Sequence, residues 1–251
     1  MSERVRVGVL ASGAGTNLEA LLRACGRDGF PASVVLVLCN RTGAPALDIA
    51  RAWGVEAHAM PQREHSNDAA ARDRAMVARM RAAGVRLVVC AGYDRLLSDE
   101  FLDAFPDAIL NVHPSLLPAF GGGMHAVEDA LEHGAKVSGC TVQLLEHGEA
   151  DGGPIVLQAA VPVHEHDDAD SLRARIHEQE WILLPRAVDL WSSGRLRRDG
   201  RRIHIDVEAG PAASGWPPRR RSPELAASGS APAASPASTA PDAIPRVAPQ
   251  P

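Results

Sequence analysis

Two polar side chains, Asn111 and His113, end a short apolar run in this sequence of 251 residues. Side chains two positions apart in a strand project to the same face of a sheet. A neutral amide and an imidazole that face one point can stabilise a developing oxyanion and transfer a proton to it. A lone histidine is more often a core residue, but Pro114 and Pro118 make the following chain rigid and favour a catalytic role for His113.

An aspartate in a flexible loop is the second candidate. Asp151 precedes two glycines and a proline, residues 152–154, and this pattern is typical of a simple turn. Its carboxylate could equally hold His113 in the protonated form and relay a proton through water. The pattern alone does not bring the two groups together, so both interpretations stay open.

A glycine-rich turn follows the first apolar run and opens a helix. Residues 11–17 read Ala-Ser-Gly-Ala-Gly-Thr-Asn. The backbone N–H groups of such a turn and the positive end of the helix dipole form an anion site, to which Thr16 and Asn17 can add side-chain donors. Leu18 stands where a dinucleotide fingerprint needs its third glycine, and the Gly-Lys-Ser/Thr of a P-loop is missing. The turn therefore predicts phosphate binding without a nucleotide, with a plain tight turn as the alternative.

Short apolar runs alternate with helical periods along the first part of the chain. The runs span residues 5–10, 34–38, 55–59, 87–90 and 109–112, and helices are expected after the first turn, at 45–53 and at 67–83. This alternation predicts a doubly wound α/β fold, with a mostly parallel sheet and helices on both faces. Ligands bind beyond the carboxyl ends of the strands in such a sheet, where the candidate motifs lie.

The pattern changes after Gly139. Two strand-like runs, 141–145 and 155–163, are joined by a short loop and predict an antiparallel C-terminal addition to the sheet. A last helix at 169–191 and a short strand at 202–207 are expected to complete the domain.

The composition divides the chain into two regions. Residues 1–210 are expected to form one catalytic domain. Residues 211–251 hold 10 of the 19 prolines together with 11 Ala and 6 Ser. Because this Pro/Ala/Ser-rich tail offers little apolar surface to bury, we expect it to be disordered.

Charge and cysteine usage exclude several classes of partner. The net charge is −5, and the tail contributes +2, so residues 1–210 carry −7 and would repel a nucleic-acid backbone. No apolar run approaches the roughly 18 residues of a membrane span, and no signal peptide is visible. The four cysteines form no Cys-x-x-Cys pair, which favours reduced structural thiols over a metal site. We expect a cytoplasmic protein that acts on small molecules.

Three motifs, in their order and spacing, resemble the phosphoribosylglycinamide formyltransferase family, folate-dependent enzymes of purine biosynthesis. They are Ser12-Gly-x-Gly-Thr-Asn17, Asn111-x-His-Pro-Ser-Leu-Leu-Pro118 and Asp151-Gly-Gly-Pro154, and the resemblance spans about residues 4–207. It implies the formyltransferase fold. It also implies transfer of a formyl group from the co-substrate 10-formyltetrahydrofolate to the amine of 5-phosphoribosylglycinamide, without a metal.

The resemblance also implies a role for particular residues. Those with an implied role are the catalytic Asn111, His113 and Asp151; the phosphate-binding Gly15, Thr16 and Asn17; the glycinamide-binding Glu180; and the folate-binding Arg95, Leu96, Leu97 and Asn111. Asn111 and protonated His113 would stabilise the tetrahedral oxyanion, and Asp151 would support that protonation.

The chain departs from the family pattern at four places. Residues 121–123 are three glycines where the family has a shorter loop, and the stretch 145–150 is also one residue longer. Gln143 stands where many members have His, and Ala69 where some have an Arg near the folate tail. A triglycine should loosen the loop beside the substrate.

Four other functions remain as alternatives for this pattern of residues. Formyltetrahydrofolate deformylase, a hydrolase, shares the fold and the catalytic trio but resembles a chain with an extra N-terminal domain and His-His-Ser-Phe-Leu-Pro in place of residues 113–118. Methionyl-tRNA formyltransferase would add a nucleic-acid-binding domain. A nicotinamide-dependent oxidoreductase would need an acidic residue after the second strand, where Asn40 and Arg41 stand. A non-catalytic paralogue that binds folate or a phosphosugar is the remaining alternative.

Overall fold

The computed structural model describes residues 3–206 of the chain. The predicted boundary at residue 210 and the tail at 211–251 lie outside the described residues. None of the helices within residues 3–206 combines the length and the apolar composition that a transmembrane span needs.

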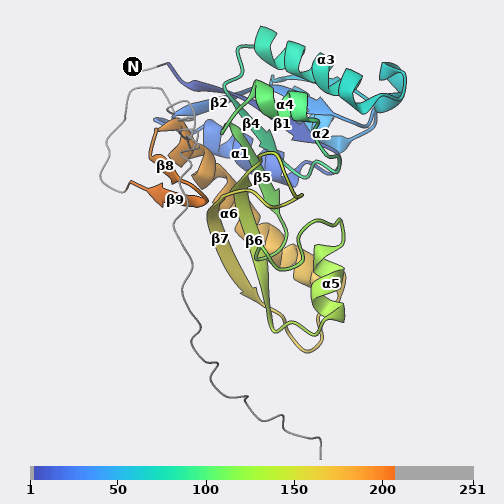
Figure 1. Cartoon of the computed structure of the whole chain (residues 1–251), viewed down its shortest axis with the longest axis vertical. Helices are drawn as coiled ribbons and strands as arrows, with labels where there is room; N and C mark the ends of the chain where they lie inside the picture. The colour runs from blue at the N-terminus through green and yellow to red at the C-terminus, as the bar shows by residue number, and fades with distance from the viewer. Residues whose placement is uncertain (1–2, 207–251) are drawn as a thin grey trace, which may run out of the picture. The chain divides into compact units, whose positions relative to one another are not determined.

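A seven-stranded sheet forms the centre of the molecule (Figure 1). In sheet order its strands are β3 (Glu56–Ala59), β2 (Ala32–Cys39), β1 (Val5–Ala11), β4 (Leu87–Cys90), β5 (Ile109–His113), β6 (Val137–Leu144) and β7 (Ile155–Pro162). The pairings from β3 to β5 are parallel, and those of β5 with β6 and β6 with β7 are antiparallel. The predicted doubly wound fold with its antiparallel addition is confirmed.

Helices cover both faces of this sheet. The helices of residues 3–206 are α1 (Thr16–Cys25), α2 (Pro45–Ala52), the 3₁₀ helix η1 (Gln62–His65), α3 (Ala69–Ala82), α4 (Asp99–Ala104), α5 (Ala126–Glu132) and α6 (Ala169–Ser192). Helix α1 packs against α2 and α6, and α3 packs against α4. Right-handed crossovers on the two sides of β1 place these two groups on opposite faces.

Helix starts follow local sequence signals. Asp68 caps α3 by accepting the N–H of Ala70, and Asp168 forms a reciprocal capping box with Ser171 at the start of α6. Pro45 occupies the first turn of α2, where its missing N–H costs nothing.

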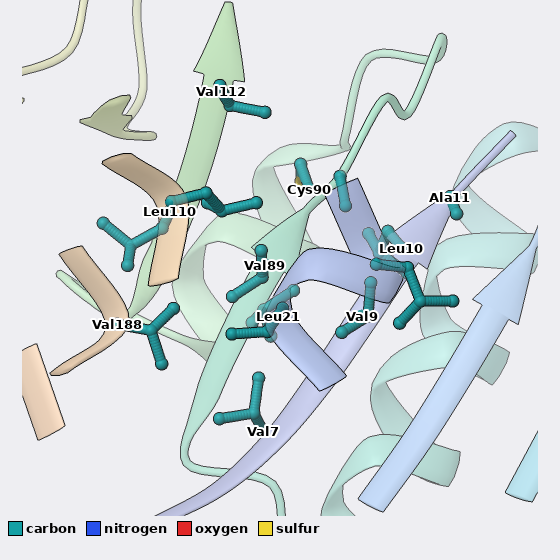
Figure 2. Close-up of a cluster of buried hydrophobic side chains, with 14 of the residues drawn as sticks. Val7, Val9, Leu10, Ala11, Leu21, Val89, Cys90, Leu110, Val112 and Val188 are labelled. Carbon is teal, nitrogen blue, oxygen red and sulfur yellow. The ribbon is translucent and has the colours of Figure 1, made fainter. Parts of the chain in front are cut away.

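The core consists of apolar side chains from the central strands and the helices that cover them. Val7, Val9 and Leu10 of β1 are fully buried, together with Leu21 of α1 and Val188 of α6 (Figure 2). Burial of each such side chain stabilises the fold by about 1.5–3 kcal/mol. Because β1 is buried on both faces, its residues form a nearly continuous apolar run rather than an alternating one.

The four cysteines belong to this core and are unpaired. Burial raises the pKa of Cys25 and Cys39 to about 11 and that of Cys90 and Cys140 to about 12. The thiols therefore stay protonated at neutral pH and pack as small apolar groups.

Short elements were missed by the sequence pattern. Helices α4 and α5 have six and seven residues, too few for an apolar period to show. The expected last strand, β9 (Arg202–Ile205), pairs with the unpredicted β8 (Leu196–Asp199) in a separate two-stranded sheet. Three of the four residues of β8 are charged, so it lacks the apolar alternation of a strand.

The strand order reverses between β1 and β4, which are neighbours in the sheet. In doubly wound folds the crevice at the carboxyl ends of two such strands is the usual ligand site. The turns that follow β1, β4 and β5 therefore frame the candidate site.

Candidate active site

The glycine-rich turn has a backbone that only glycine adopts easily. Gly15 is the N-cap of α1, with φ of 80°, and no side chain caps this helix end. A Cβ atom at Gly15 would lie 2.8 Å from the Cα atom of Ala46, at the start of α2. The backbone N–H of Ala46 in turn donates to the carbonyl of Gly13 at 3.2 Å. The turn thus leaves the start of α1 without a capping side chain, as an anion site requires.

Asn17 of α1 and Glu180 of α6 meet in the interior. The Asn17 Nδ2 donates to Glu180 Oε2 at 2.7 Å, and both side chains are buried. Burial raises the pKa of the Glu180 carboxyl, and this rise is partly offset by the Asn17 hydrogen bond and by the nearby rings of His177 and His113. Two predicted substrate contacts, far apart in the sequence, therefore lie together.

A cavity of about 150 Å³ opens beside this pair. Among its lining residues are Asn17 and Glu180, with Gly92 after β4, Pro114 after β5 and Arg173 of α6. His113 and Asp151 do not line it. A larger hollow of about 360 Å³ lies between α1 and α6, around Phe30 and Trp181, and contains none of the predicted site residues.

His113, the last residue of β5, faces a hydrogen-bond acceptor with each ring nitrogen. Its Nδ1 lies 3.3 Å from Asp151 Oδ2, and its Nε2 lies 3.0 Å from the backbone oxygen of Phe120. Only an imidazolium carries hydrogen on both nitrogens and can donate to both acceptors. The Asp151 carboxylate and the Phe120 carbonyl thus lie within reach of the two ring nitrogens.

Asp151 is held in place by side-chain and backbone donors from two other segments. Gln143 Nε2 donates to its Oδ1 at 2.8 Å, and the backbone N–H of Gly122 donates to its Oδ2 at 2.8 Å. The backbone of Asp151 has φ of 57°, in the left-handed region that non-glycine residues rarely adopt. The triglycine lies directly against Asp151. A Cβ atom at Gly121 would lie 3.3 Å from the Cβ of Asp151, so glycine at this position leaves room for the Asp151 side chain.

The segment after His113 is fixed by Thr141 of β6, which pairs with His113 in the sheet. The Thr141 hydroxyl donates to the carbonyl of Ser115 at 2.7 Å and accepts the N–H of Leu117 at 3.0 Å. Gln158 of β7 donates to the carbonyl of Leu117 at 3.0 Å. These bonds set the course of the chain from His113 to Phe120.

Asn111 and the predicted folate segment lie at the same sheet edge. Asn111 is half-buried, opposite Cys90 of β4 and Gln143 of β6 in the strand register. In the segment after β4, Leu96 is 79% exposed, Leu97 packs against the core, and Arg95 lies with its Nε 3.7 Å from Asp94 Oδ1. The exposed Leu96 leaves apolar surface available for a ligand.

Some residues of this region gave no sequence signal. Asp94 accepts hydrogen bonds from Ser12 and Asn40, Arg173 pairs with Glu128 across the cavity, and Thr141 fixes the loop after His113. Each is a common polar residue without a motif of its own. Only the pairing of distant segments shows what it contacts.

The comparisons with known proteins agree with this geometry. The model of the family described as formyl transferase matches residues 5–188. The phosphoribosylglycinamide formyltransferase of Bacillus subtilis is 36% identical over 183 residues, covering 73% of this chain and 92% of that protein. The crystal structure of glycinamide ribonucleotide transformylase 1 from Symbiobacterium toebii is 47% identical, with a TM-score of 0.79, and the match covers 82% of this chain and 95% of that one.

A further group of relatives is much longer. The trifunctional purine biosynthetic protein adenosine-3 of Drosophila melanogaster is 40% identical over 194 residues, which are 76% of this chain but only 14% of that protein. The other parts of that protein have no counterpart in the match. Over residues 5–188 and along nearly the whole length of its single-function relatives, the chain belongs to the formyl transferase family, in its phosphoribosylglycinamide formyltransferase branch.

Proposed function

We propose that the chain transfers a formyl group from 10-formyltetrahydrofolate to the amine of 5-phosphoribosylglycinamide. The products are formylglycinamide ribonucleotide and tetrahydrofolate, as in purine biosynthesis. The observation that carries this proposal is the meeting of His113 with Asp151 at the strand edge that also holds Asn111 and the glycine-rich turn. The names of the relatives, matched along nearly their whole length, support the same reaction.

The phosphate end of the substrate would lie against residues 15–17. The start of α1 offers backbone N–H groups without a side-chain cap, and the helix dipole favours a negative charge there. The glycinamide end would then reach Glu180, which the Asn17 amide holds at the wall of the cavity. Glu180 as a carboxylate would accept hydrogen bonds from the N–H groups of that end.

The chemistry needs a group that stabilises negative charge on the formyl oxygen. The substrate amine forms a bond to the formyl carbon, and the carbonyl electron pair moves to the oxygen. The amide of Asn111 would donate to that oxyanion, and Nε2 of the charged His113 ring would donate to it in place of the Phe120 carbonyl that it contacts in this structure. Asp151, 3.3 Å from the ring, would hold it charged and accept or pass protons through water.

Collapse of the tetrahedral intermediate completes the transfer. The bond between the formyl carbon and N10 of the folate breaks, and the proton that leaves the attacking amine ends on N10. No redox change occurs, and every atom of the two substrates is found in the two products. The folate itself would lie along Arg95, Leu96 and Leu97, next to Asn111, where the exposed Leu96 offers an apolar contact.

The test is turnover of the purified protein with 10-formyltetrahydrofolate, with and without phosphoribosylglycinamide, followed by the release of tetrahydrofolate. We expect release only when the glycinamide is present. Release without it would identify a hydrolase of the deformylase type. Folate binding without release would contradict catalysis and leave a binding protein. Asp151→Asn is the matched variant, because it keeps the shape of the side chain while it removes the charge beside His113, and we expect it to lower kcat by about 10²-fold or more.

A further inference from the structure

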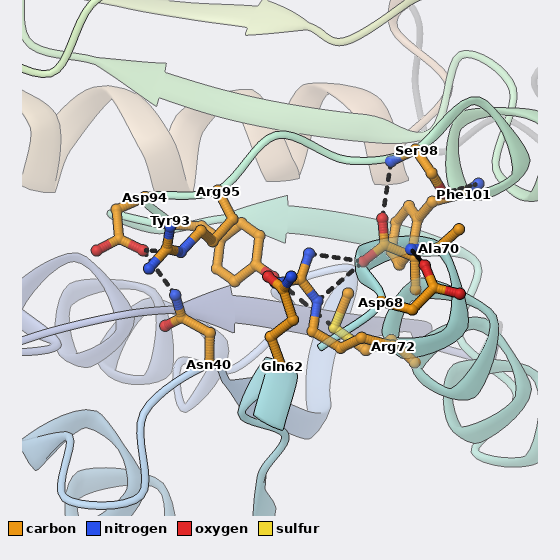
Figure 3. A network of polar contacts seen from close by, with 12 residues as sticks. Asn40, Gln62, Asp68, Ala70, Arg72, Tyr93, Asp94, Arg95, Ser98 and Phe101 are labelled. Atoms are coloured by element: carbon orange, nitrogen blue, oxygen red, sulfur yellow. Dashed lines mark hydrogen bonds and ion pairs between the residues drawn. The ribbon is translucent and has the colours of Figure 1, made fainter. Parts of the chain in front are cut away.

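Asp94 lies where the turns after three neighbouring strands meet. It follows β4, and it contacts Ser12, which follows β1. It also contacts Asn40, which follows β2 (Figure 3). Its side chain is only 15% exposed. Asp94 is not among the residues to which the proposed reaction gives a role.

The contacts of Asp94 tie the glycine-rich turn to the segment after β4. Ser12 Oγ donates to Asp94 Oδ1 at 2.9 Å and accepts the backbone N–H of Asp94 at 3.0 Å. The backbone N–H of Ser12 donates to the carbonyl of Gly92 at 3.1 Å. Asn40 Nδ2 donates to the same Oδ1 at 2.6 Å. Ser12 is therefore held by three hydrogen bonds to one short segment, residues 92–94.

Two arginines balance the charge of this carboxylate. Arg41 forms an ion pair with Asp94 Oδ2, and Arg95 Nε lies 3.7 Å from Oδ1. Partial burial raises the pKa of Asp94, but the hydrogen bonds from Asn40 and Ser12 and the two arginines outweigh it, so the pKa is lowered overall. Both arginine side chains are more than half exposed, and ion pairs of that kind contribute little to stability.

We propose that Asp94 is a positioning residue for the phosphate-binding turn. Its Oδ1 fixes Ser12, and Ser12 fixes the direction in which the backbone N–H groups of residues 13–17 point. The inference rests on the proposed function only in assigning a phosphate to this turn. Displacements of about 1 Å in such positioning groups have large effects on binding and rate.

Positioning by Asp94 and electrostatic repulsion by its charge predict opposite changes in phosphate binding when Asp94 is substituted. A carboxylate close to a phosphate site weakens anion binding by repulsion. If its charge were what matters, removal of that charge would tighten phosphate binding. If its geometry is what matters, loss of the Oδ1 atom weakens binding even though the repulsion has gone.

The experiment measures the Kd of ribose 5-phosphate by titration calorimetry for the full chain and four variants. Asp94→Ala and Ser12→Ala remove the bond between the two residues, and we expect each to weaken binding by about tenfold. Asp94→Asn keeps a carbonyl oxygen at the Oδ1 position, and Arg41→Gln removes only the exposed ion pair. We expect both to stay within about twofold of the wild-type Kd.

A double variant and a kinetic readout sharpen the result. Because Asp94 and Ser12 act through one contact, their combined loss should be no larger than either single loss. In the active enzyme, Asp94→Ala should raise KM for phosphoribosylglycinamide about tenfold and leave kcat within about twofold, a split that general destabilisation does not produce.

Three outcomes would overturn the proposal: unchanged or tighter binding by Asp94→Ala, equal loss in Arg41→Gln, or failure of the wild type to bind ribose 5-phosphate. Should Asp94→Ala fail to fold, Ser12→Ala and Asp94→Asn still decide between the two explanations. The binding measurement needs no turnover. A wild type that binds ribose 5-phosphate with the expected pattern but releases no tetrahydrofolate would therefore contradict the proposed function and leave this inference standing.

Discussion

The glycine-rich turn and the His113–Asp151 pair lie at the same edge of the sheet but are held by different kinds of contact. In the turn, Gly15 adopts φ of 80° without strain, and backbone atoms of Ala46 and Gly13 lie against each other. In the pair, Asp151 adopts φ of 57° within a local turn in which the Gly152 N–H donates to the carbonyl of Glu149 at 3.0 Å, and its side chain is held by donors from other segments.

This difference shows how the two parts of the site depend on the rest of the chain. A turn built on glycine and on the N-terminus of a helix is specified within a few residues of sequence. A non-glycine residue in the left-handed region costs about 1–2 kcal/mol, so its position depends on the side chains that surround it. We therefore expect the backbone conformation of the turn to depend mainly on its own glycines, with Asp94 as a support from outside, and the position of the Asp151 side chain to depend on distant segments.

The largest effect is expected from His113→Ala. The ring lies 3.3 Å from the Asp151 carboxylate, and its loss should lower kcat by about 10²–10⁴-fold because the oxyanion would lose a donor. Titration with ribose 5-phosphate should give a nearly unchanged Kd, since the turn does not contact this ring. Rate measurements with saturating substrates test the expected loss of kcat, and the titration tests the expected unchanged Kd. Near-normal turnover would remove His113 from the mechanism.

The same difference explains how much could be predicted from the sequence. The turn at residues 11–17 and the strand that ends in Asn111 and His113 were predicted from local patterns, because glycine spacing and apolar runs report backbone geometry directly. The fold class followed from the alternation of such runs, and the sheet confirms it.

The partners of Asp151 could not be predicted in this way. Its approach to His113 was an open interpretation, and the hydrogen bonds from Gln143 and Gly122 depend on the register of β5 with β6 and on the course of a loop. Asp94 is a similar case, because its contacts join the ends of three different strands. Side-chain contacts between distant segments have no period in the sequence.

The second effect in size concerns the turn itself. Gly15→Ala would force a side chain into the left-handed region, with its Cβ 2.8 Å from the Cα of Ala46. We expect a loss of about 1–3 kcal/mol in the free energy of unfolding, together with weaker ribose 5-phosphate binding. Chemical denaturation and calorimetric titration measure the two effects.

Gly13→Ala is the matched control for this substitution. No atom lies within 4 Å of a Cβ at Gly13, so the variant should keep its stability within about 0.5 kcal/mol. Equal loss in both variants would contradict the idea that backbone geometry at Gly15 specifies the turn.

A smaller effect is expected at Glu180, which links α6 to the start of α1. Because burial raises its pKa in the folded chain, the folded state binds this proton more tightly than the unfolded state does. Its contribution to stability is therefore best at low pH and decreases as pH rises from the ordinary Glu value through the folded value. Glu180→Gln should melt at a higher temperature than the wild type at pH 7, by a few degrees at most, and the difference should shrink toward zero below about pH 4.

Glu128→Gln provides the control with the opposite sign. The pKa of Glu128 is lowered by its own backbone N–H and by Arg173, so its carboxylate stabilises the fold above the ordinary Glu pKa. This variant should melt at or below the wild-type temperature at pH 7. If the difference in melting temperature between Glu180→Gln and the wild type were the same at every pH, the ionised Glu180 carboxylate would not destabilise the fold, and the prediction would be wrong.

The smallest effect is expected beside the His113–Asp151 pair, where the β8–β9 hairpin contacts the loop that carries Asp151. Gly152 directly follows Asp151, and its carbonyl accepts a hydrogen bond from Arg201 Nη1 at 2.8 Å. Because Arg201 is exposed, its loss should lower kcat only about twofold and leave KM for phosphoribosylglycinamide unchanged. Arg197→Ala removes an exposed arginine from the same hairpin and should leave both constants unchanged. A change in KM rather than in kcat for Arg201→Ala would mean that the loop of Asp151 and the glycine-rich turn are not held independently, and the contrast between the two regions would fail.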